Sequence, residues 1–382
     1  MKITYVSSHD VSNIHSWSGL IYYIAKSLKD QNIEIDFLDY SNTIKKINTL
    51  TKIKKKAYSL IGKSFDYSRD PEMVKKIGQE IETQLNENSG IIFSPSSIPI
   101  ALLNTKLPKV FYCDATFAGL IDYYEEYFTI SNETKKNGLI LEQKAFDNCS
   151  LAIFSSDWAA QTAINNYNVD YKKVKVIPFG ANIECDRTEE DIKKIILNRS
   201  KFECNLLFIG VDWERKGGNM ALSVTEKLRE RGINAKLHIV GPKLNPIIED
   251  NNYAIYHGFI SKSTESGREK LDKLFSESHF FILPTKAEAF GLVFSEANSF
   301  GLPCIATNTG GIPTIIKDGI NGKMFDINDE QMKYVDYIQN LLMNSINYEK
   351  LSYSSFIEYK NRLNWNVTGK KLYQLLKEIE IY

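Results

Sequence analysis

Residues 280–313 read FFILPTKAEAFGLVFSEANSFGLPCIATNTGGIP, and this stretch decides the fold class. It begins with four apolar residues, as in a strand that is buried on both faces of a parallel sheet, and Pro284 ends that strand. A polar loop leads to Gly291, apolar residues then recur at helical spacing, and residues 304–306 predict the next strand. This order is typical of a parallel α/β sheet, where the helix begins at the carboxyl edge of the strands and can bind phosphate.

Two carboxylates, Glu288 and Glu296, flank the predicted helix start. The helical rise places Glu296 ~7.5 Å beyond Gly291, which suits the ribose of a nucleotide whose diphosphate binds the amides near Gly291. Carboxylates repel phosphate, so we interpret Glu296 as an acceptor for ribose hydroxyls and Glu288 as an acceptor for a transferred sugar. Solvent exposure would be the simpler interpretation of an isolated pair. A second glycine turn, Gly310-Gly311, returns to the same edge and favours a site.

With Phe290-Gly291 between the glutamates and Gly310-Gly311 after them, the stretch resembles the signature of the retaining GT-B glycosyltransferases of family GT4, the glycosyl transferases group 1. The resemblance is close over residues 200–325 and loose elsewhere. It implies an α/β protein of the GT-B class, with two Rossmann-like doubly wound domains facing across a cleft, that transfers a sugar from a nucleotide-sugar with retention. The donor-binding residues that it implies are Arg215, Ala289, Phe290, Gly291, Leu292, Glu296, Gly19, Gly310 and Gly311.

The loop over residues 210–218 adds the cations that a diphosphate requires. The family usually has an Arg just after the first glycine and a Lys just before the later one. Lys216 matches the Lys, whereas Val211 stands where the Arg is expected, which leaves Arg215 as the candidate replacement. A strand-to-helix turn with solvated charges is the alternative, and Gly217-Gly218 beside two cations argues against it.

Composition is that of a globular protein with two domains: 382 residues, 43% hydrophobic and 25% charged. Formal net charge is zero, so we expect no nucleic-acid partner. No run approaches the ~20 apolar residues of a membrane span, and a strand predicted at residues 2–6 leaves no room for a signal peptide. Five cysteines without a pairing pattern indicate free thiols. We therefore expect a cytoplasmic protein, or one peripheral on the inner face of the membrane.

Strands alternate with helices along the chain, which predicts parallel sheets in both domains. We expect an acceptor domain over residues 1–183 and a nucleotide-sugar donor domain over residues 184–365. A polar segment at 184–200 is the candidate hinge. The resemblance implies that a last helix, residues 366–382, packs back on the first domain.

The loop before the first helix ends in Trp17-Ser18-Gly19. Gly19 would let a ligand approach the backbone closely, whereas Ser18 alone is more simply a helix N-cap. We expect Trp17 on the acceptor side. His9 and His15 share this loop and are expected to be exposed.

Asp114 follows the strand predicted at residues 109–113, where family members often have a His. It could hydrogen-bond a sugar hydroxyl or help to deprotonate an acceptor, or it could cap the next helix. We expect Thr116 and Tyr123 on the acceptor side, although packing is the commoner use of a tyrosine. The catalytic residues that we expect are Glu288, Lys216 and Asp114.

A basic segment spans residues 41–64 and contains no Asp or Glu. Apolar residues recur in it at spacings of three and four, which predicts one or two amphipathic helices. Either the apolar face packs on the domain and the lysines are solvated, or the segment lies on an anionic membrane surface, where each lysine adds about 1 kcal/mol. The seven lysines are Lys45, Lys46, Lys52, Lys54, Lys55, Lys56 and Lys63.

No metal-binding motif is present, so we expect neither metal nor cofactor. The expected reaction moves a hexose from a UDP- or GDP-sugar to a glycan, a lipid-linked acceptor or a protein, in bacterial surface polysaccharide or glycoconjugate synthesis. A sugar-nucleotide epimerase or phosphorylase of the same fold is the alternative, as is a non-catalytic partner subunit. NAD binding is not expected, because the first strand–helix turn lacks G-x-G-x-x-G.

Overall fold

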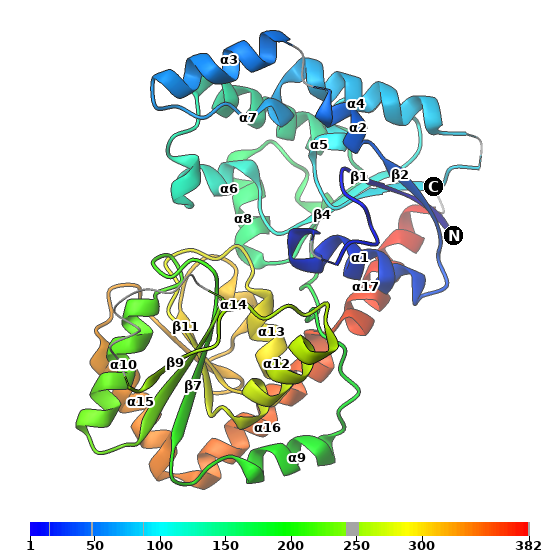
Figure 1. Ribbon diagram of the computed structural model, residues 1–382. Helices are drawn as coiled ribbons and strands as arrows, with labels where there is room; N and C mark the ends of the chain where they lie inside the picture. The colour runs from blue at the N-terminus through cyan, green and yellow to red at the C-terminus, as the bar shows by residue number, and fades with distance from the viewer. Residues whose placement is uncertain (15, 47–48, 87, 242–251, 381–382) are drawn as a thin grey trace. The chain divides into compact units, whose positions relative to one another are not determined.

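A computed structural model describes residues 1–14, 16–46, 49–86, 88–241 and 252–380. His15 and residues 47–48 of the basic segment lie outside the described residues. The chain divides into two compact units (Figure 1). The N-terminal unit comprises Met1–Phe179 and Trp365–Tyr382, and the C-terminal unit is Gly180–Asn364, whereas the sequence places this boundary at residues 183 and 184.

A parallel six-stranded sheet forms the centre of the N-terminal unit, in the order β2-β1-β3-β4-β5-β6. Ile3 of β1 pairs with Ile35 of β2 on one side and with Ile91 of β3 on the other. All five side chains of β4 are buried, as the apolar pattern of a central parallel strand requires. The strands are β1 Lys2–Ser7, β2 Glu34–Asp39, β3 Ile91–Ser94, β4 Lys109–Cys113, β5 Leu151–Phe154 and β6 Val174–Val176.

Helices cover both faces of this sheet, with α1 and α17 on one face and α4, α5 and α7 on the other (Figure 1). Helix α17 packs closely on α1, because a Cβ at Gly369 would lie 2.4 Å from the carbonyl oxygen of Ser27. The helices are α1 Leu20–Lys29, α2 Ser41–Lys45, α3 Thr49–Leu60, α4 Pro71–Gln84, α5 Ile98–Ala101, α6 Phe117–Ile121, α7 Asn132–Asn148, α8 Asp157–Asn166 and α17 Trp365–Glu380, with short 3-10 turns at Ser16–Gly19, Tyr67–Arg69, Glu125–Tyr127 and Tyr171–Lys173.

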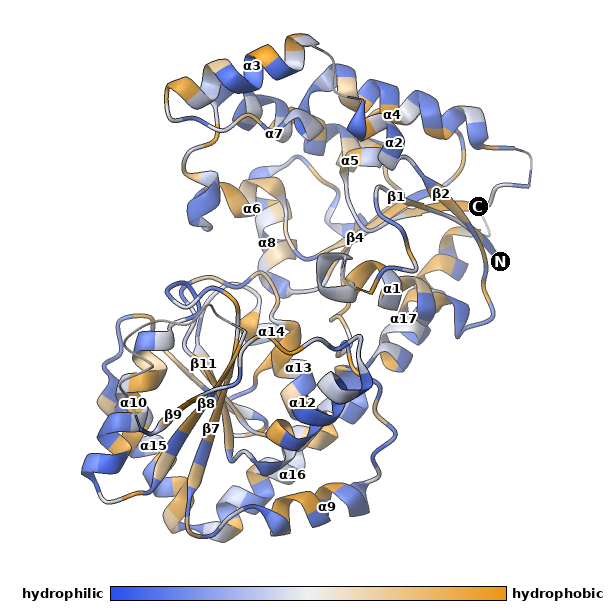
Figure 2. Cartoon of the chain, in the orientation of Figure 1, coloured by the Kyte–Doolittle hydropathy of each residue, from blue (hydrophilic) through white to orange (hydrophobic). Residues whose placement is uncertain are grey.

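The basic segment forms α2 and α3, and α3 has no buried residue. Its apolar side chains Leu50, Ile53 and Leu60 are each more than half exposed. The helix is held instead by its polar groups, since Lys54 pairs with Glu133 and the Tyr58 hydroxyl donates to the same carboxylate at 2.9 Å. The alternative in which the apolar face of the segment packs on the domain is therefore wrong for α3, which shows apolar and polar residues side by side on its surface (Figure 2).

The C-terminal unit contains a second parallel sheet of six strands, in the order β12-β11-β10-β7-β8-β9. Helices α10 and α15 lie on one face and α12, α13 and α16 on the other (Figure 1). The strands are β7 Cys204–Ile209, β8 Ala235–Val240, β9 Ala254–Tyr256, β10 Phe280–Leu283, β11 Cys304–Thr307 and β12 Gly322–Phe325, and the helices are α9 Glu189–Asn198, α10 Gly218–Glu230, α12 Glu265–Glu277, α13 Leu292–Asn298, α14 Ile312–Ile315, α15 Gln331–Met343 and α16 Ser345–Arg362.

The direction of strand succession reverses between β7 and β10. From β7 the chain adds β8 and β9 to one side, and from β10 it adds β11 and β12 to the other. The loops that follow β7 and β10 therefore separate at the carboxyl edge, where doubly wound sheets bind their ligands. Two Rossmann-like parallel sheets with flanking helices confirm the predicted fold class.

Candidate active site

Lys216 and Glu288 form an ion pair at this reversal point. Lys216 ends the loop after β7, and Glu288 lies in the loop after β10. The Lys216 ammonium donates to Oε2 of Glu288, and each of the two side chains is only 13% exposed. A pair so shielded from water interacts more strongly than a surface pair, and removing either partner leaves a buried charge uncompensated.

Glycines clamp the two loops together at positions where no side chain fits. Gly217 has a φ of 76°, and a Cβ there would lie 2.0 Å from the carbonyl oxygen of Pro284, at the end of β10. A Cβ at Gly311 would lie 2.0 Å from the carbonyl oxygen of Ala289, and the Gly311 amide donates to the Glu288 carbonyl at 3.0 Å. The turn at Gly310-Gly311 thus fixes the backbone that carries Glu288. The sequence predicted that this turn returns to the same edge of the sheet.

Arg215 and its neighbour Lys216 bind different groups of the loop after β10. Its Nη1 donates to the carbonyl of Ala287 at 2.9 Å, and its Nε pairs with Asp212 at 3.2 Å. Val211, which occupies the position expected for an Arg, is mostly exposed. The guanidinium therefore holds the loop before Glu288, and the two adjacent cations have different partners.

Glu296 lies in α13 and is 2% exposed. It pairs with Lys262, in the segment before α12. Sequence reasoning missed Lys262, because 34 residues separate the two and no motif connects them. The two glutamates thus sit in separate ion pairs, each with its own lysine.

The remaining donor-side candidates frame α13. Gly291 is its N-cap at a φ of 97°, where a Cβ would lie 2.7 Å from the Phe294 ring. The side chains of Ala289 and Phe290 are buried, and Leu292 is the first residue of the helix. Gly310, at a φ of 52°, precedes Gly311 in the turn before α14.

In the N-terminal unit, Trp17, Ser18 and Gly19 all have left-handed backbone conformations, with φ of 49°, 55° and 87°. Two of them are not glycine, and such strained residues tend to occur at ligand sites. Gly19, not Ser18, is the N-cap of α1, so the capping interpretation of Ser18 is wrong. Trp17 is 46% exposed, and the imidazole of His9 lies 5.9 Å from its indole.

The residues after β4 divide between surface and interior. Asp114 is half-buried at the strand end. Thr116 is fully buried, and its hydroxyl accepts from the amide of Gly119 at 3.0 Å, so the N-cap of α6 that the sequence allowed for Asp114 is Thr116. Tyr123 packs on Trp158 with a ring separation of 4.8 Å.

Glu142 supports this loop from α7 and was not found from the sequence. Its carboxylate accepts from the Phe117 amide and the Tyr167 hydroxyl, both at 2.5 Å, and from the Ser97 hydroxyl at 3.0 Å. Burial raises the pKa of Glu142, and the nearby Arg69 charge and these hydrogen bonds only partly oppose that effect. A mid-helix glutamate gives no sequence signal for such a role.

In the part of the chain that the structure describes, no three His, Cys, Asp or Glu side chains converge to hold a metal ion. None of the described helices has both the length and the apolar character required to cross a bilayer.

Residues 189–357 match the family model described as glycosyl transferases group 1. An uncharacterised 41.2 kDa protein in the cps region of Klebsiella pneumoniae is 24% identical over 264 residues, which cover 68% of this chain and 69% of that protein. Sucrose-phosphate synthase from Thermosynechococcus elongatus has a similar structure, with a TM-score of 0.70, 16% identity and coverage of 99% of this chain and 98% of that one. Anabaena HepE in complex with UDP and glucose is also similar, with a TM-score of 0.63, 14% identity and coverage of 99% of both chains. At such identities the structures establish a shared fold, the GT-B architecture.

Proposed function

We propose that this chain, whose residues 189–357 match the glycosyl transferases group 1 model, is a glycosyltransferase that moves a hexose from a UDP- or GDP-sugar to an acceptor with retention of configuration. The proposed acceptor is a glycan, a glycolipid or a glycoprotein of the bacterial surface. Similarity to a protein named for a cps region supports this acceptor class, and the UDP and glucose bound to Anabaena HepE support the donor class.

The Lys216–Glu288 pair at the strand-order reversal is the observation that carries this proposal. A nucleoside diphosphate needs a cation near its leaving oxygen, and the transferred sugar needs an acceptor for its hydroxyls. One shielded ion pair supplies both groups, on loops that glycine contacts hold in place. Binding of the donor would exchange the carboxylate of Glu288 for phosphate as the partner of Lys216.

Glu296 is the proposed ligand of the ribose. It is nearly inaccessible beneath Lys262, so a ribose hydroxyl would meet an oriented carboxylate rather than a mobile one. The ion pair with Lys262 offsets part of the cost of burying this side chain, because an unpaired buried charge is costly. We propose Lys262 as the positioning residue of this subsite.

In the proposed reaction, the bond between the anomeric carbon and the diphosphate oxygen breaks, and its electron pair leaves with the diphosphate. Lys216 stabilises the charge that develops there. The acceptor hydroxyl oxygen bonds the same carbon and releases its proton. In the N-terminal unit, Asp114 is the proposed carboxylate for hydrogen-bonding the acceptor or taking this proton, with Trp17, Thr116 and Tyr123 on the acceptor side. Gly19 remains a proposed donor-binding residue. We propose no metal or other cofactor for this chemistry.

A ligand screen tests the proposal. Thermal unfolding of the protein is measured with UDP, GDP and several of their sugars, since a nucleotide at ~100 times its dissociation constant stabilises by about 2.7 kcal/mol. We expect one diphosphate and its sugar to raise the melting temperature, and added acceptor to accelerate donor consumption. Donor turnover that needs no acceptor would identify an epimerase or phosphorylase instead. Binding without any turnover would identify a non-catalytic subunit, and no stabilisation by any nucleotide would exclude the proposal.

We propose in addition that α3 attaches the enzyme to the anionic inner face of the membrane, with the rest of the protein in the cytoplasm. The support is the unusual surface of α3, where Leu50, Ile53 and Leu60 are exposed beside lysines and no acidic residue interrupts the segment. Apolar side chains next to cations suit a headgroup region, which solvates both. The proposed membrane segment runs from Lys45 to Lys63.

A further inference from the structure

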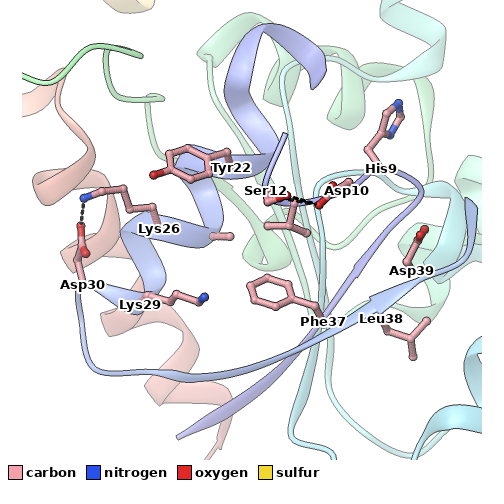
Figure 3. Close-up of a pocket in the computed structure, with 12 residues that line it drawn as sticks. His9, Asp10, Ser12, Tyr22, Lys26, Lys29, Asp30, Phe37, Leu38 and Asp39 are labelled. Carbon is pink, nitrogen blue, oxygen red and sulfur yellow. Dashed lines mark hydrogen bonds and ion pairs between the residues drawn. The ribbon is translucent and has the colours of Figure 1, made fainter. Parts of the chain in front are cut away.

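A cavity of about 490 Å³ lies in the N-terminal unit, at the carboxyl edge of β1 and β2 (Figure 3). Its walls come from the loop after β1, from α1 and from the end of β2, with Asp10, Lys29 and Phe37 on the three sides. The cavity adjoins the strained loop, because His9 both lines it and packs on Trp17. A volume of this size admits one or two sugar rings.

Phe37 provides a fixed aromatic surface inside the cavity. It is 43% exposed, although it belongs to a strand of the sheet. Its ring meets the buried Tyr5 ring at 5.8 Å and an interplanar angle of 62°, so packing from below fixes its orientation. An exposed aromatic ring held rigidly in a concave site suits the apolar C–H face of a hexose.

Lys29 is the cation of this cavity that has no acidic partner among the described residues. Its ammonium lies 4.7 Å above the centre of the Phe37 ring, and Figure 3 shows the side chain reaching from α1 toward that ring. The other lysine of the lining, Lys26, pairs instead with Asp30 at 3.0 Å. Lys29 is therefore available to an anionic group.

The carboxylates of the lining are already hydrogen-bonded. Asp10 accepts from the amide and hydroxyl of Ser12 at 2.9 and 2.7 Å. Asp39 accepts likewise from Ser41 at 2.7 and 2.9 Å. Each carboxylate retains acceptor capacity for a hydroxyl group. Because two lysines face three aspartates, a bare inorganic anion is not favoured here, whereas hydroxyl groups around one anionic group match the lining.

We propose that this cavity is an acceptor subsite for an anionic sugar unit, carrying a carboxylate or a phosphate. The sugar ring lies on Phe37, its hydroxyls donate to Asp10, and its anionic group pairs with Lys29. The assignment to the acceptor rests on the proposed glycosyl transfer, while the binding of an anionic sugar does not.

Lys29 must leave the Phe37 ring for the sugar to lie there, and the relative strengths of its two contacts permit this. An exposed cation–π contact is worth about a two- to fivefold factor in an equilibrium constant. A charge-assisted hydrogen bond is worth roughly tenfold or more. The Lys29 ammonium therefore binds the anionic group of the ligand in preference to the Phe37 ring, which leaves the ring free to contact the sugar.

Calorimetry on the full chain tests this inference with four probes: methyl glucuronide, glucose-6-phosphate, methyl glucoside and inorganic phosphate. We expect one or both anionic sugars to bind about tenfold more tightly than methyl glucoside, and inorganic phosphate not to bind. The stronger of the two anionic sugars identifies a carboxylate or a phosphate. Lys29→Gln should abolish the advantage of the anionic sugar, whereas Lys76→Gln, on the exposed side of α4, should preserve it. Phe37→Leu should weaken charged and neutral sugars alike.

Equal affinities for charged and neutral glycosides, an unchanged preference in Lys29→Gln, inorganic phosphate binding as tightly as the sugars, or no binding of any sugar would overturn the inference. UDP and GDP are titrated into the same samples, and Lys29→Gln should bind them as the unaltered protein does. Loss of all nucleotide binding with sugar binding intact would defeat the proposed function and leave the cavity assignment standing. Nucleotide binding without any sugar binding would defeat the cavity assignment alone.

Discussion

The carboxyl edges of the two sheets differ in how far their charged groups are satisfied. In the C-terminal unit, Lys216 and Lys262 each pair with a glutamate, and glycines press the loops against neighbouring backbone. In the N-terminal unit, the corresponding edge has an open cavity, a strained loop and Lys29, which has no acidic partner in the part of the chain that the structure describes. Sheets of the same architecture thus carry one site that is organised before ligand binds and one that is not.

The difference matches the demands of the two proposed substrates. Every donor of one nucleotide type presents the same diphosphate and ribose, so a fixed arrangement of charges can be kept and serves catalysis best. Acceptors differ between enzymes, and loops on a rigid scaffold are where such variation is tolerated. We infer that donor specificity is set by packing and acceptor specificity by exposed side chains.

Lys216→Ala should have the largest effect among the substitutions at the carboxyl edge of the C-terminal sheet. We expect an intact fold and a loss of turnover of about a hundredfold, ~2.7 kcal/mol, because the charge that stabilises the leaving diphosphate is removed. Steady-state rates of donor consumption measure the effect, and circular dichroism checks the fold.

Arg215→Ala is the matched control, since it removes a neighbouring cation that holds the Ala287 carbonyl. A clearly smaller loss than that of Lys216→Ala is expected. Losses of the same size would mean that Arg215 has taken the place of the missing cation, and that the division of roles between the two is mistaken.

The two glutamates give the second test. Glu296→Gln should weaken nucleoside diphosphate and intact donor alike, by ~1.5–3 kcal/mol, because a charge-assisted hydrogen bond to the ribose is lost. Glu288→Gln should depress transfer while diphosphate affinity stays the same or rises slightly, since Lys216 loses its competing carboxylate. Calorimetry with both ligands on both variants measures the four affinities. Equal losses of diphosphate affinity would contradict the assignment of ribose to Glu296 and sugar to Glu288.

Between pH 7 and pH 5, acid should weaken the C-terminal unit more than the N-terminal one. Burial lowers the pKa of His279 from 6.5 to about 4, and the hydrogen bond from its ring to the Ser200 carbonyl at 2.8 Å only partly opposes that effect. The unfolded chain then binds the extra proton, so this stability is present above pH 6.5 and lost as pH falls toward 4, at about 2 kcal/mol between pH 7 and pH 5. The pKa of His238 is lowered in the same direction.

The pKa shift of Glu142, in the N-terminal unit, has the opposite effect on stability. Its pKa is raised above 4.5 in the folded state, so the stability that it contributes is greatest at low pH and declines as pH rises above 4.5. Hydrogen exchange resolved by unit, corrected for intrinsic rates, should show protection of the C-terminal unit falling first on acidification. His279→Gln should flatten that response and His9→Gln should not. Equal losses in the two units would refute this difference.

The smallest effects concern α3, at about 1 kcal/mol for each lysine near a charged surface. Sedimentation with phosphatidylglycerol vesicles should pellet the protein at low salt and progressively less at high salt. Lys52→Gln with Lys56→Gln should reduce pelleting, and Lys75→Gln with Lys76→Gln on α4 should leave it unchanged. Salt-independent pelleting, or none at low salt, would remove α3 as a membrane contact.

Local sequence predicted the fold class and the match of residues 189–357 to the glycosyl transferases group 1 model, because both depend on short-range patterns. The four apolar residues of β10 and the glycine that starts α13 lie where periodicity and turn chemistry place them. The roles proposed for Glu288, Lys216 and Asp114 stay predictions. The N-cap predicted at Ser18 is wrong because a left-handed turn extends over Trp17, Ser18 and Gly19 and α1 begins only after it, which a helix-capping rule for one serine does not reveal.

What the sequence determined alone is therefore a set of strands, helices and glycine turns, together with the residue types available at each strand end. The tertiary structure decided which of these side chains meet. Lys216 and Glu288 are 72 residues apart in the sequence. They meet because the sheet places β7 directly beside β10, although β8 and β9 lie between these two strands in the sequence. The same long-range order brings Lys262 to Glu296, exposes the apolar side of α3 and leaves Lys29 above Phe37. Spacing along a chain records no partner at such separations, since only packing of the whole sheet brings those side chains within hydrogen-bonding distance.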